Sequence, residues 1–194
     1  ADYTATESSV TMECLFRYQY IPESGESDVF SNQQRGGMGI GIDAGRLNLF
    51  VNVGGAWKQP ACNIETGRWY HVAGTYDGRT VKLYVNGELA DSVAAPGIIQ
   101  PPETAARFFV IGGDSGNQVV QYHSQTTVSF ARLYSQALTA EDAALLSEEA
   151  LKAVSPVDSG DMLLNVDFAD GTAADTAGGR PPRAQGEPVI ASLD

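Results

Sequence analysis

The sequence predicts an all-β protein in which two antiparallel sheets pack face to face, with one short helix near residues 140–153. Three observations support this fold class. Many short segments alternate between hydrophobic and polar residues, which is typical of strands with one buried face. Asp-Gly and Asn-Gly dipeptides separate some of these segments. The 194 residues also include 21 glycines and 9% aromatic residues, a composition that suits a sheet protein rich in turns.

The clearest local signal is a three-stranded meander over residues 69–76, 80–85 and 88–93. Asp77-Gly78 and Asn86-Gly87 connect these segments. Both dipeptides favour type I′ turns, because such turns need positive φ at both central residues. Within the middle segment, Val81 and Leu83 alternate with Lys82, so one face of this meander is expected to be buried and the other exposed to water.

Other strands are predicted on the same basis at 10–20, 37–42, 46–53, 108–111, 128–134, 162–168 and 188–193. In the first of them, Val10, Met12, Cys14, Phe16 and Tyr18 share one face. In residues 46–53, the inward set is Leu47, Leu49, Val51 and Val53, and the outward set is Asn48, Phe50 and Asn52. Many short antiparallel strands at this spacing indicate a two-sheet sandwich.

A single helix is predicted from about residue 140 to residue 153, before Pro156. Thr139 is placed to cap its first turn, and Asp142 follows three residues later as the partner of a capping box. The apolar side of the helix is expected to consist of Leu145, Leu146 and Leu151.

Several motifs together resemble the laminin-G-like, concanavalin-A-like lectin and glucanase domains. They are GRWYHVAGTYDG (67–78), LYVNG (83–87), VIGGD (110–114) and FARLYS (130–135), followed by LTAE (138–141), and they span roughly residues 8–150 in the family's order. The resemblance implies a jelly roll over residues 1–154, followed by a linker at 155–160. It also implies a module of a secreted or surface bacterial protein, attached to a hydrolase or a calcineurin-like phosphoesterase.

The chain departs from the family pattern at its two ends. The stretch LLNVDFADG (163–171) with DTAG (175–178) looks like the opening of the family placed at the end of the chain. The segment 161–194 either begins a second repeat or completes the sandwich, in a permuted arrangement or by exchange between chains. Because an open sheet edge is costly, we favour completion of the sandwich.

Charge and hydropathy narrow the classes of partner. The net charge is −12, with 24 acidic and 12 basic residues, which disfavours nucleic acid as a partner because phosphate binding depends on Lys and Arg. No apolar run approaches the roughly 20 residues of a membrane span, so membrane insertion is not expected.

Cys14 and Cys62 form either one disulfide or two buried thiols.

No catalytic constellation is recognised. Glycoside hydrolases of this sandwich carry two carboxylates on one strand, and the nearest matches are residues 23–28, expected to be a turn, and Glu148-Glu149 on the helix. Nucleophile-elbow, zinc-protease and phosphate-loop motifs are absent from the sequence. His71 is expected to be a hydrogen-bonded structural residue. The sequence therefore predicts a protein that binds and is not an enzyme.

The predicted function is binding of a glycan or polysaccharide. The alternative function is that of a spacer or docking domain that contacts other domains of a parent protein. Aromatic faces pack on sugar rings, and polar side chains bond the hydroxyls. The alternative is that Phe50 and Trp57 pack under a loop and that Gly37, Gly39 and Gly41 only relieve crowding instead of forming a shallow trough. The predicted binding residues are Arg35, Asn48, Phe50, Asn52, Trp57, Tyr122 and His123.

A structural calcium ion is a second expectation. Asp167, Asp170 and Asp175 cluster in sequence around Gly171, and calcium prefers several oxygen ligands on flexible backbone. The family resemblance implies calcium near this opening stretch, with Asp175 as the first ligand to carry over. The expected location of the protein is extracellular or at the cell surface.

Overall fold

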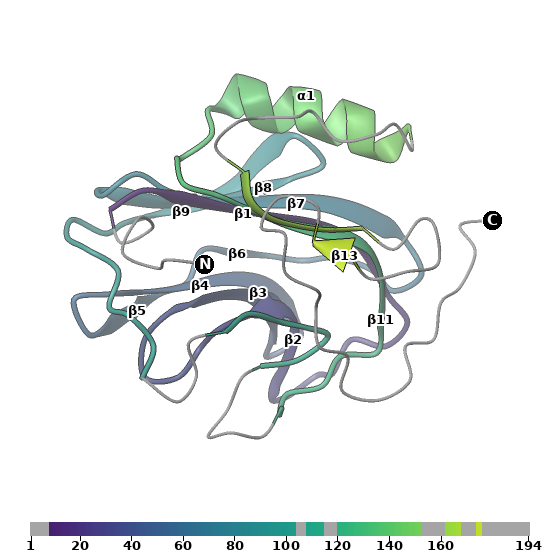
Figure 1. Cartoon of the computed structure of the whole chain (residues 1–194). Coiled ribbons are helices and arrows are strands. Elements are labelled where there is room, and N and C mark those ends of the chain that lie inside the picture. The colour runs from purple at the N-terminus through teal and green to yellow at the C-terminus, as the bar shows by residue number, and fades with distance from the viewer. Residues whose placement is uncertain (1–7, 104–107, 115–119, 153–161, 168–173, 176–194) are drawn as a thin grey trace.

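Two antiparallel sheets face each other across one hydrophobic core (Figure 1). The computed structural model describes residues 8–103, 108–114, 120–152, 162–167 and 174–175. Within these residues, one sheet has seven strands and the other has six, and one helix lies outside them. The predicted fold class, an all-β jelly-roll sandwich with one short helix, is confirmed.

The seven-stranded sheet has β1 at its centre, flanked by β7 on one side and β11 on the other. Its order is β13-β12-β11-β1-β7-β8-β9. The strands are β1 (Val10–Tyr18), β7 (Trp69–Tyr76), β8 (Thr80–Val85), β9 (Glu88–Ala94), β11 (Thr126–Tyr134), β12 (Met162–Asp167) and β13 (Ala174–Asp175). The predicted meander corresponds to β7, β8 and β9, with positive φ at Asn86 and Gly87 as its second turn requires.

The six-stranded sheet follows the order β10-β2-β3-β4-β5, and β6 pairs with β4 beside β5. Its strands are β2 (Glu26–Ser31), β3 (Met38–Asp43), β4 (Arg46–Val53), β5 (Ala56–Lys58), β6 (Ala61–Cys62) and β10 (Val110–Ile111). Every pair among these strands is antiparallel. This sheet carries the candidate site on the face that points away from the core.

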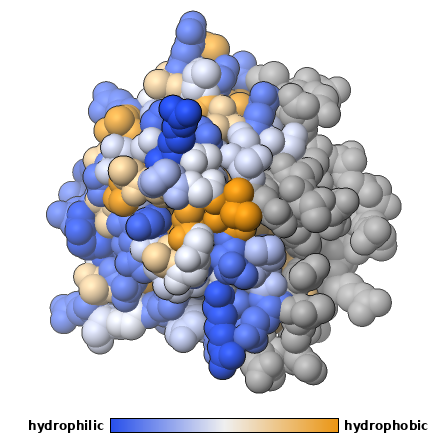
Figure 2. All heavy atoms as spheres, turned by 90° about the vertical axis from the view of Figure 1, so that its left-hand side faces the viewer, coloured by the Kyte–Doolittle hydropathy of each residue, from blue (hydrophilic) through white to orange (hydrophobic). Residues whose placement is uncertain are grey.

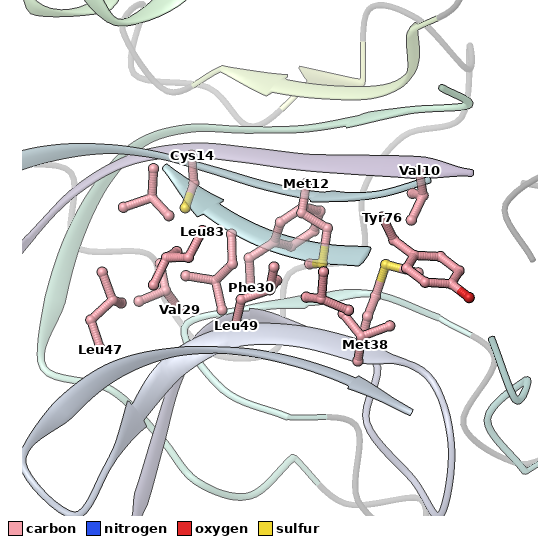
Figure 3. Packing of buried hydrophobic residues seen from close by; sticks show 14 of the residues in the cluster. Val10, Met12, Cys14, Val29, Phe30, Met38, Leu47, Leu49, Tyr76 and Leu83 are labelled. Atoms are coloured by element: carbon pink, nitrogen blue, oxygen red, sulfur yellow. The ribbon is translucent and has the colours of Figure 1, made fainter. Parts of the chain in front are cut away.

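The core between the sheets consists of the hydrophobic faces that the alternation predicted. Met12 and Cys14 of β1 and Leu83 of β8 point toward Leu47 and Leu49 of β4 (Figure 3). All five have exposed fractions of 1% or less. The inward sets predicted for residues 10–20 and 46–53 belong to this cluster in full, which confirms both assignments.

The helix α1 (Ala140–Leu151) lies across the outer face of the seven-stranded sheet (Figure 1). Thr139 is its N-cap, and the capping box with Asp142 is formed as predicted. The buried side of the helix differs from the prediction, because Leu145 and Leu151 are exposed and small residues such as Ala143 and Ala150 face the sheet. These alanines allow the helix backbone to approach the sheet closely.

The strands β2 and β5 of the six-stranded sheet were not predicted. Residues 26–31 form β2, although the sequence predicted a turn at 23–28, and Trp57 lies in β5 and not in a loop. Polar residues on the outward face of β2 obscure its alternation, and pairing with β3 overrides the weak local preference. This correction matters for function, because it places Glu26 and Asp28 on one strand.

The segment after the helix extends the seven-stranded sheet within the same chain. β12 pairs antiparallel with β11, with Ala131 opposite Val166, and β13 pairs with β12. The predicted linker at 155–160 and the predicted strand at 188–193 lie outside the described residues. The proposed division of the chain into a jelly roll, a linker and a completing segment stays a prediction.

The two cysteines are free. Cys14 is fully buried, and burial together with the neighbouring Glu13 charge raises the pKa of its thiol well above the usual value. Cys62 is only partly buried, opposite Leu47. Among the helices that the structure describes, none has the length and apolar character needed to cross a membrane.

Candidate functional site

A pocket of about 220 Å³ opens on the outer face of the six-stranded sheet. Its aromatic wall is formed by Phe50, Trp57 and Tyr122. The polar part consists of carboxylates, of the amide side chains of four glutamines and of the guanidinium of Arg35. A pocket of this size is smaller than the roughly 300–1,000 Å³ of drug-sized ligand sites, which suits one or two sugar-sized rings.

Trp57 is held on the outer face by a tight hairpin. Gly54 and Gly55 connect β4 to β5 with φ of 59° and 84°, the left-handed conformation that a two-residue turn of this kind requires. The resulting register places Trp57 directly opposite Asn52. The residue remains 38% exposed, so part of it is accessible to a ligand.

Tyr122 approaches from a loop that is tied to β2. Its carbonyl oxygen accepts a hydrogen bond from the backbone N–H of Asp28 at 2.8 Å, and its own φ is 51°. Gln121 exchanges two backbone hydrogen bonds with Asp114. These bonds fix the loop and present the Tyr122 side chain, which is 43% exposed, at the pocket.

Arg35 also lines the pocket, and its own backbone is left-handed, with φ of 52°. Its guanidinium donates to Glu103 Oε1 at 3.0 Å, and the side chain is largely exposed. An exposed pair of this kind contributes little to stability, so Arg35 can exchange Glu103 for a ligand at small cost.

Carboxylates gather at the polar end of the pocket. Glu26, Asp43 and Asp114 line it, and Asp28 lies behind them on the same face of β2 as Glu26. Gln33 Nε2 donates to Glu26 Oε1 at 3.2 Å and to Asp28 Oδ2 at 3.5 Å. Ser31 donates to Asp114 Oδ1 at 2.5 Å.

Burial and mutual repulsion raise the pKa values of two of these carboxyls. Burial, followed by the charges of Asp114 and Asp43, raises the pKa of Glu26 to about 7. Burial, followed by the charges of Glu26, Asp114 and Asp43, raises the pKa of Asp28 to about 9. The Oδ1 atom of Asp28 is buried and has no hydrogen-bond partner among the described residues. The cluster therefore holds more negative groups than its surroundings neutralise.

The glycine face of β3 does not form an open trough. A Cβ on Gly41 would lie 2.1 Å from Asp28 Oδ1, and one on Gly39 would lie 2.6 Å from Gln33 Nε2. On Gly37 it would meet Asn32. The glycines thus make room for polar side chains from β2 and the turn after it, which matches the alternative in which they relieve crowding.

The structure brings four of the seven predicted binding residues together, since Arg35, Phe50, Trp57 and Tyr122 all line the pocket. Phe50 is nevertheless 97% shielded from solvent, with an exposed fraction of 3%. The other three do not line it. Asn48 and Asn52 are buried, with the Asn48 amide bonded to the carbonyl oxygens of Asp43 and Arg46, and His123 is exposed nearby, bridged to Asp28 through the backbone.

The predicted calcium ligands lie on the late strands. Asp167 is opposite Ala174 and Asp175 is opposite Val166, so the two aspartates occupy adjacent rungs of the β12–β13 pair. Asp170 lies outside the described residues. Within the part of the chain that the structure describes, no group of three or more His, Cys, Asp or Glu side chains is arranged to hold a metal ion. Calcium stays a prediction.

Sequence reasoning missed the carboxylates and glutamines of the pocket. Glu26 and Asp28 are two residues apart, which in a strand places both on one face, but this signal is readable only once β2 is recognised. Asp114 is part of the VIGGD motif, and its role was not inferred from it. The remaining polar lining residues come from the end of β3 and from the connections between strands, and their convergence depends on the tertiary fold.

A second polar cluster is buried in the seven-stranded sheet, centred on Glu13 of β1. Its carboxylate accepts from Tyr134 at 2.5 Å and from Arg132 at 3.3 Å, and it lies 2.9 Å from His71 Nε2. All four side chains are at most 4% exposed. His71 is thus a hydrogen-bonded structural residue, as predicted, and this cluster has no access to a ligand.

The side of the molecule that lies at the left of Figure 1 is mostly hydrophilic (Figure 2). Its hydrophobic residues form a small patch near the centre of the view and further small groups toward the top and the upper left. The described part of this face therefore lacks the broad apolar surface that an obligate interface needs.

Similar solved structures share the fold. A proposed carbohydrate-binding protein from Bacteroides ovatus ATCC 8483 superposes with a TM-score of 0.67 at 22% identity, covering 89% of this chain and 50% of that one. The binding domain of botulinum neurotoxin DC, in complex with SialylT, gives a TM-score of 0.58 at 14% identity, covering 77% of this chain and 37% of that one.

Sequence comparison adds a curated relative and a family. Mouse (Mus musculus) pappalysin-1 is 37% identical over 59 residues, which are 29% of this chain and 4% of that protein. The chain thus spans half or less of each of these relatives. The model of the family described as the concanavalin A-like lectin/glucanases superfamily, Laminin_G_3, matches residues 1–144. With this match over most of its length, the chain belongs to the concanavalin A-like lectin/glucanase superfamily.

Proposed function

We propose that this chain is a non-catalytic carbohydrate-binding module and that the pocket on the six-stranded sheet is its glycan site. The observation that carries this proposal is the exposure of two aromatic side chains, Trp57 and Tyr122, at one pocket. A sugar ring packs its C–H face on such side chains. The amides of Gln34, Gln59 and Gln121 at the same pocket offer both donors and acceptors to sugar hydroxyls.

The comparisons support the proposal without carrying it. The Bacteroides ovatus protein is named for carbohydrate binding, and the neurotoxin domain is in complex with SialylT. At 22% and 14% identity these likenesses concern the fold, and function depends on the site. The pocket residues of this chain therefore remain the basis of the proposal.

The absence of catalysis is also part of the proposal. Glu26, with a pKa of about 7, has the protonation behaviour of a general acid. A glycosidase needs a second, ionised carboxylate that reaches the sugar. The neighbouring carboxyl on β2 is Asp28, which is fully buried and has a pKa of about 9, so β2 does not present the pair of carboxylates on one strand that glycoside hydrolases of this sandwich use.

We place the module in a secreted or surface protein with further domains, because the relatives are all longer than this chain.

One observation favours the rival function, a spacer or docking domain that presents an attached phosphoesterase or hydrolase. Phe50, one of the two aromatic residues expected to meet the sugar, is buried, and its exposed fraction is 3%. Trp57, which is 38% exposed, supports the glycan site over the spacer.

The test is a glycan-array screen of the chain beside Trp57→Ala, with Leu89→Ala as an exposed hydrophobic control on β9. We expect binding that Trp57→Ala reduces at least about tenfold, because aromatic packing on a sugar is lost, with the melting temperature unchanged. Silence of the intact chain, or binding that Trp57→Ala leaves intact, would contradict the proposal.

Added calcium should raise the melting temperature if Asp167, Asp170 and Asp175 form the proposed structural site.

A further inference from the structure

We propose that the pocket selects glycans carrying a free, protonated amine, such as β-1,4-linked glucosamine, over neutral and anionic glycans. This inference rests on the proposed function and deepens it by naming the charge of the ligand. It depends on the carboxylates around the pocket, on an unpartnered buried oxygen behind them and on the aromatic side chains that line the same pocket.

The charged groups that line the pocket are mainly negative. Glu26 begins β2, Asp43 ends β3 and Asp114 follows β10, so three separate segments each bring one carboxylate to the same space. Among the described lining residues, the single positive charge is that of Arg35, and it is offset by Glu103 at 3.0 Å. A carboxylated sugar entering this space would meet like charges, whereas an ammonium group would meet opposite ones.

Asp28 provides an independent observation. It is fully buried and belongs to the same face of β2 as Glu26, and its carboxyl lies against Gly41 of β3. Its Oδ1 atom has no hydrogen-bond partner among the described residues. A buried polar atom without a partner in a cluster of carboxyls is costly, and a positive charge in the adjoining pocket would reduce the repulsion within that cluster.

The aromatic wall fits an amino sugar as well. Trp57 and Tyr122 are the exposed aromatic side chains of the pocket. A cation over an indole or phenol ring is attracted by the negative face of the ring, by an amount that adds to the stacking of the sugar itself. The same pocket thus offers a surface for the ring and charge for its amine.

Other charged groups near the cluster do not reverse its sign. Arg46 lies opposite Asp43 in the β3–β4 pair, but its guanidinium donates to the carbonyl oxygen of Ala61 at 2.8 Å and does not line the pocket. Lys58 is opposite Val51 at the edge of β5, and His123 is on the loop beside Asp28. Neither of these two lines the pocket.

The experiment compares three β-1,4-linked tetrasaccharides by titration calorimetry with the intact chain at about pH 6. They are the tetramers of glucosamine, N-acetylglucosamine and glucose, which differ only in the group at C2, with sialyllactose as the anionic probe. We expect the glucosamine tetramer to bind about tenfold more tightly than the other two tetramers, and sialyllactose not to bind. Added salt should weaken the binding of the glucosamine tetramer selectively.

Charge-removing variants locate the effect. Asp43→Asn should weaken glucosamine binding about fivefold to tenfold, whereas Glu88→Gln, on the exposed strand β9, makes the same change in net charge and should leave it unchanged. Folding of each variant is checked by its melting temperature. If Asp43→Asn and Glu88→Gln bind alike, the carboxylates of the pocket do not select the amine.

Proton release gives a second readout, because a bound ammonium favours the ionised form of a neighbouring carboxyl. Glu26, with a pKa of about 7, should release a proton when the glucosamine tetramer binds near that pH. The binding enthalpy should then differ between phosphate and Tris buffers, and Glu26→Gln should lose this difference. The neutral tetramer, if it binds, should show none.

The outcomes separate this inference from the proposed function. Equal or tighter binding of the glucose tetramer overturns selection of an amine and leaves the glycan pocket in place. Failure of all three tetramers, with Trp57-dependent binding elsewhere on the array, also overturns it. Failure of the tetramers together with a silent array overturns the proposed function itself.

Discussion

Glu13 is a buried carboxylate whose neighbours keep it charged. Burial raises its pKa, but hydrogen bonds from His71 and Tyr134 and the charge of Arg132 outweigh burial, so the pKa lies below the usual value of 4.5. A lowered carboxyl pKa stabilises the folded state above the ordinary value, and this contribution is lost as the pH falls below it. At the scale of single residues, this cluster ties together the three central strands.

We therefore expect Glu13→Gln to lower the free energy of unfolding by about 3–5 kcal/mol at pH 7, because the charge that offsets the buried guanidinium of Arg132 is removed. Urea unfolding measures the change. Part of the acid destabilisation below about pH 4 should also disappear in the variant. Glu148→Gln, which removes an exposed ion pair with Lys152 on α1, is the control and should unfold like the wild type. A Glu13→Gln variant as stable as this control would contradict the expectation.

The titration of Asp28 should change the stability of the fold with pH in the opposite direction to that of Glu13. Its pKa of about 9 in the folded state lies above the usual 3.8, so the folded chain holds a proton that the unfolded chain releases. This stabilisation is complete below about pH 4 and is lost as the pH rises to about 9, by up to ~1.4 kcal/mol per pH unit. Asp28→Asn has nearly the same shape and does not titrate.

The variant Asp28→Asn should thus match the wild type at pH 4 and exceed it in melting temperature at pH 8. Thermal unfolding across this range is the measurement. Parallel curves for the two proteins would show that Asp28 does not titrate as its surroundings indicate.

Among the elements, the late strand β12 has a defined role in the sheet. It covers the edge of β11 by pairing along residues 130–134 of that strand. Without it, β11 would present a row of unpaired backbone groups, which promotes association between chains. Deletion of residues 153–194 should lower the melting temperature by about 5 °C or more and produce concentration-dependent oligomers in light scattering. A truncated chain that stays monomeric and equally stable would show that the pairing is dispensable.

The elements also show where sequence reasoning succeeds and where it stops. The helix was predicted because Thr139 and Asp142 form a local capping box, and β4 because its alternation covers the whole strand. β2 was missed because its outward residues, among them Asp28, are polar and yet buried. Local patterns reveal hydrophobic faces, whereas a polar face becomes buried only through neighbours that are distant in sequence.

For the whole molecule, the buried polar cluster and the proposed binding site lie on different sheets. The Glu13 cluster is part of the seven-stranded sheet, which α1 covers, while Trp57, Glu26 and Asp43 belong to the other sheet. The family motifs GRWYHVAGTYDG (67–78) and FARLYS (130–135) fall in β7 and β11, so they predicted the fold well. They carry little information on the pocket, whose residues come from β2, β3, β4, β5 and the connections between strands. Four of its residues could be anticipated, and its acidic end could not.

The position of β1 between β7 and β11 has a consequence for synthesis of the protein. Glu13 is 119 residues from Arg132 and 121 from Tyr134, so on the ribosome the first strand is made long before its second neighbour. At ~5–20 residues per second, that delay is roughly 6–24 s, during which an emerging hydrophobic strand cannot reach its final partner. One edge of β1 can already pair with β7 in this interval, while the edge that β11 covers stays open. An open hydrophobic edge of this kind favours association between nascent chains.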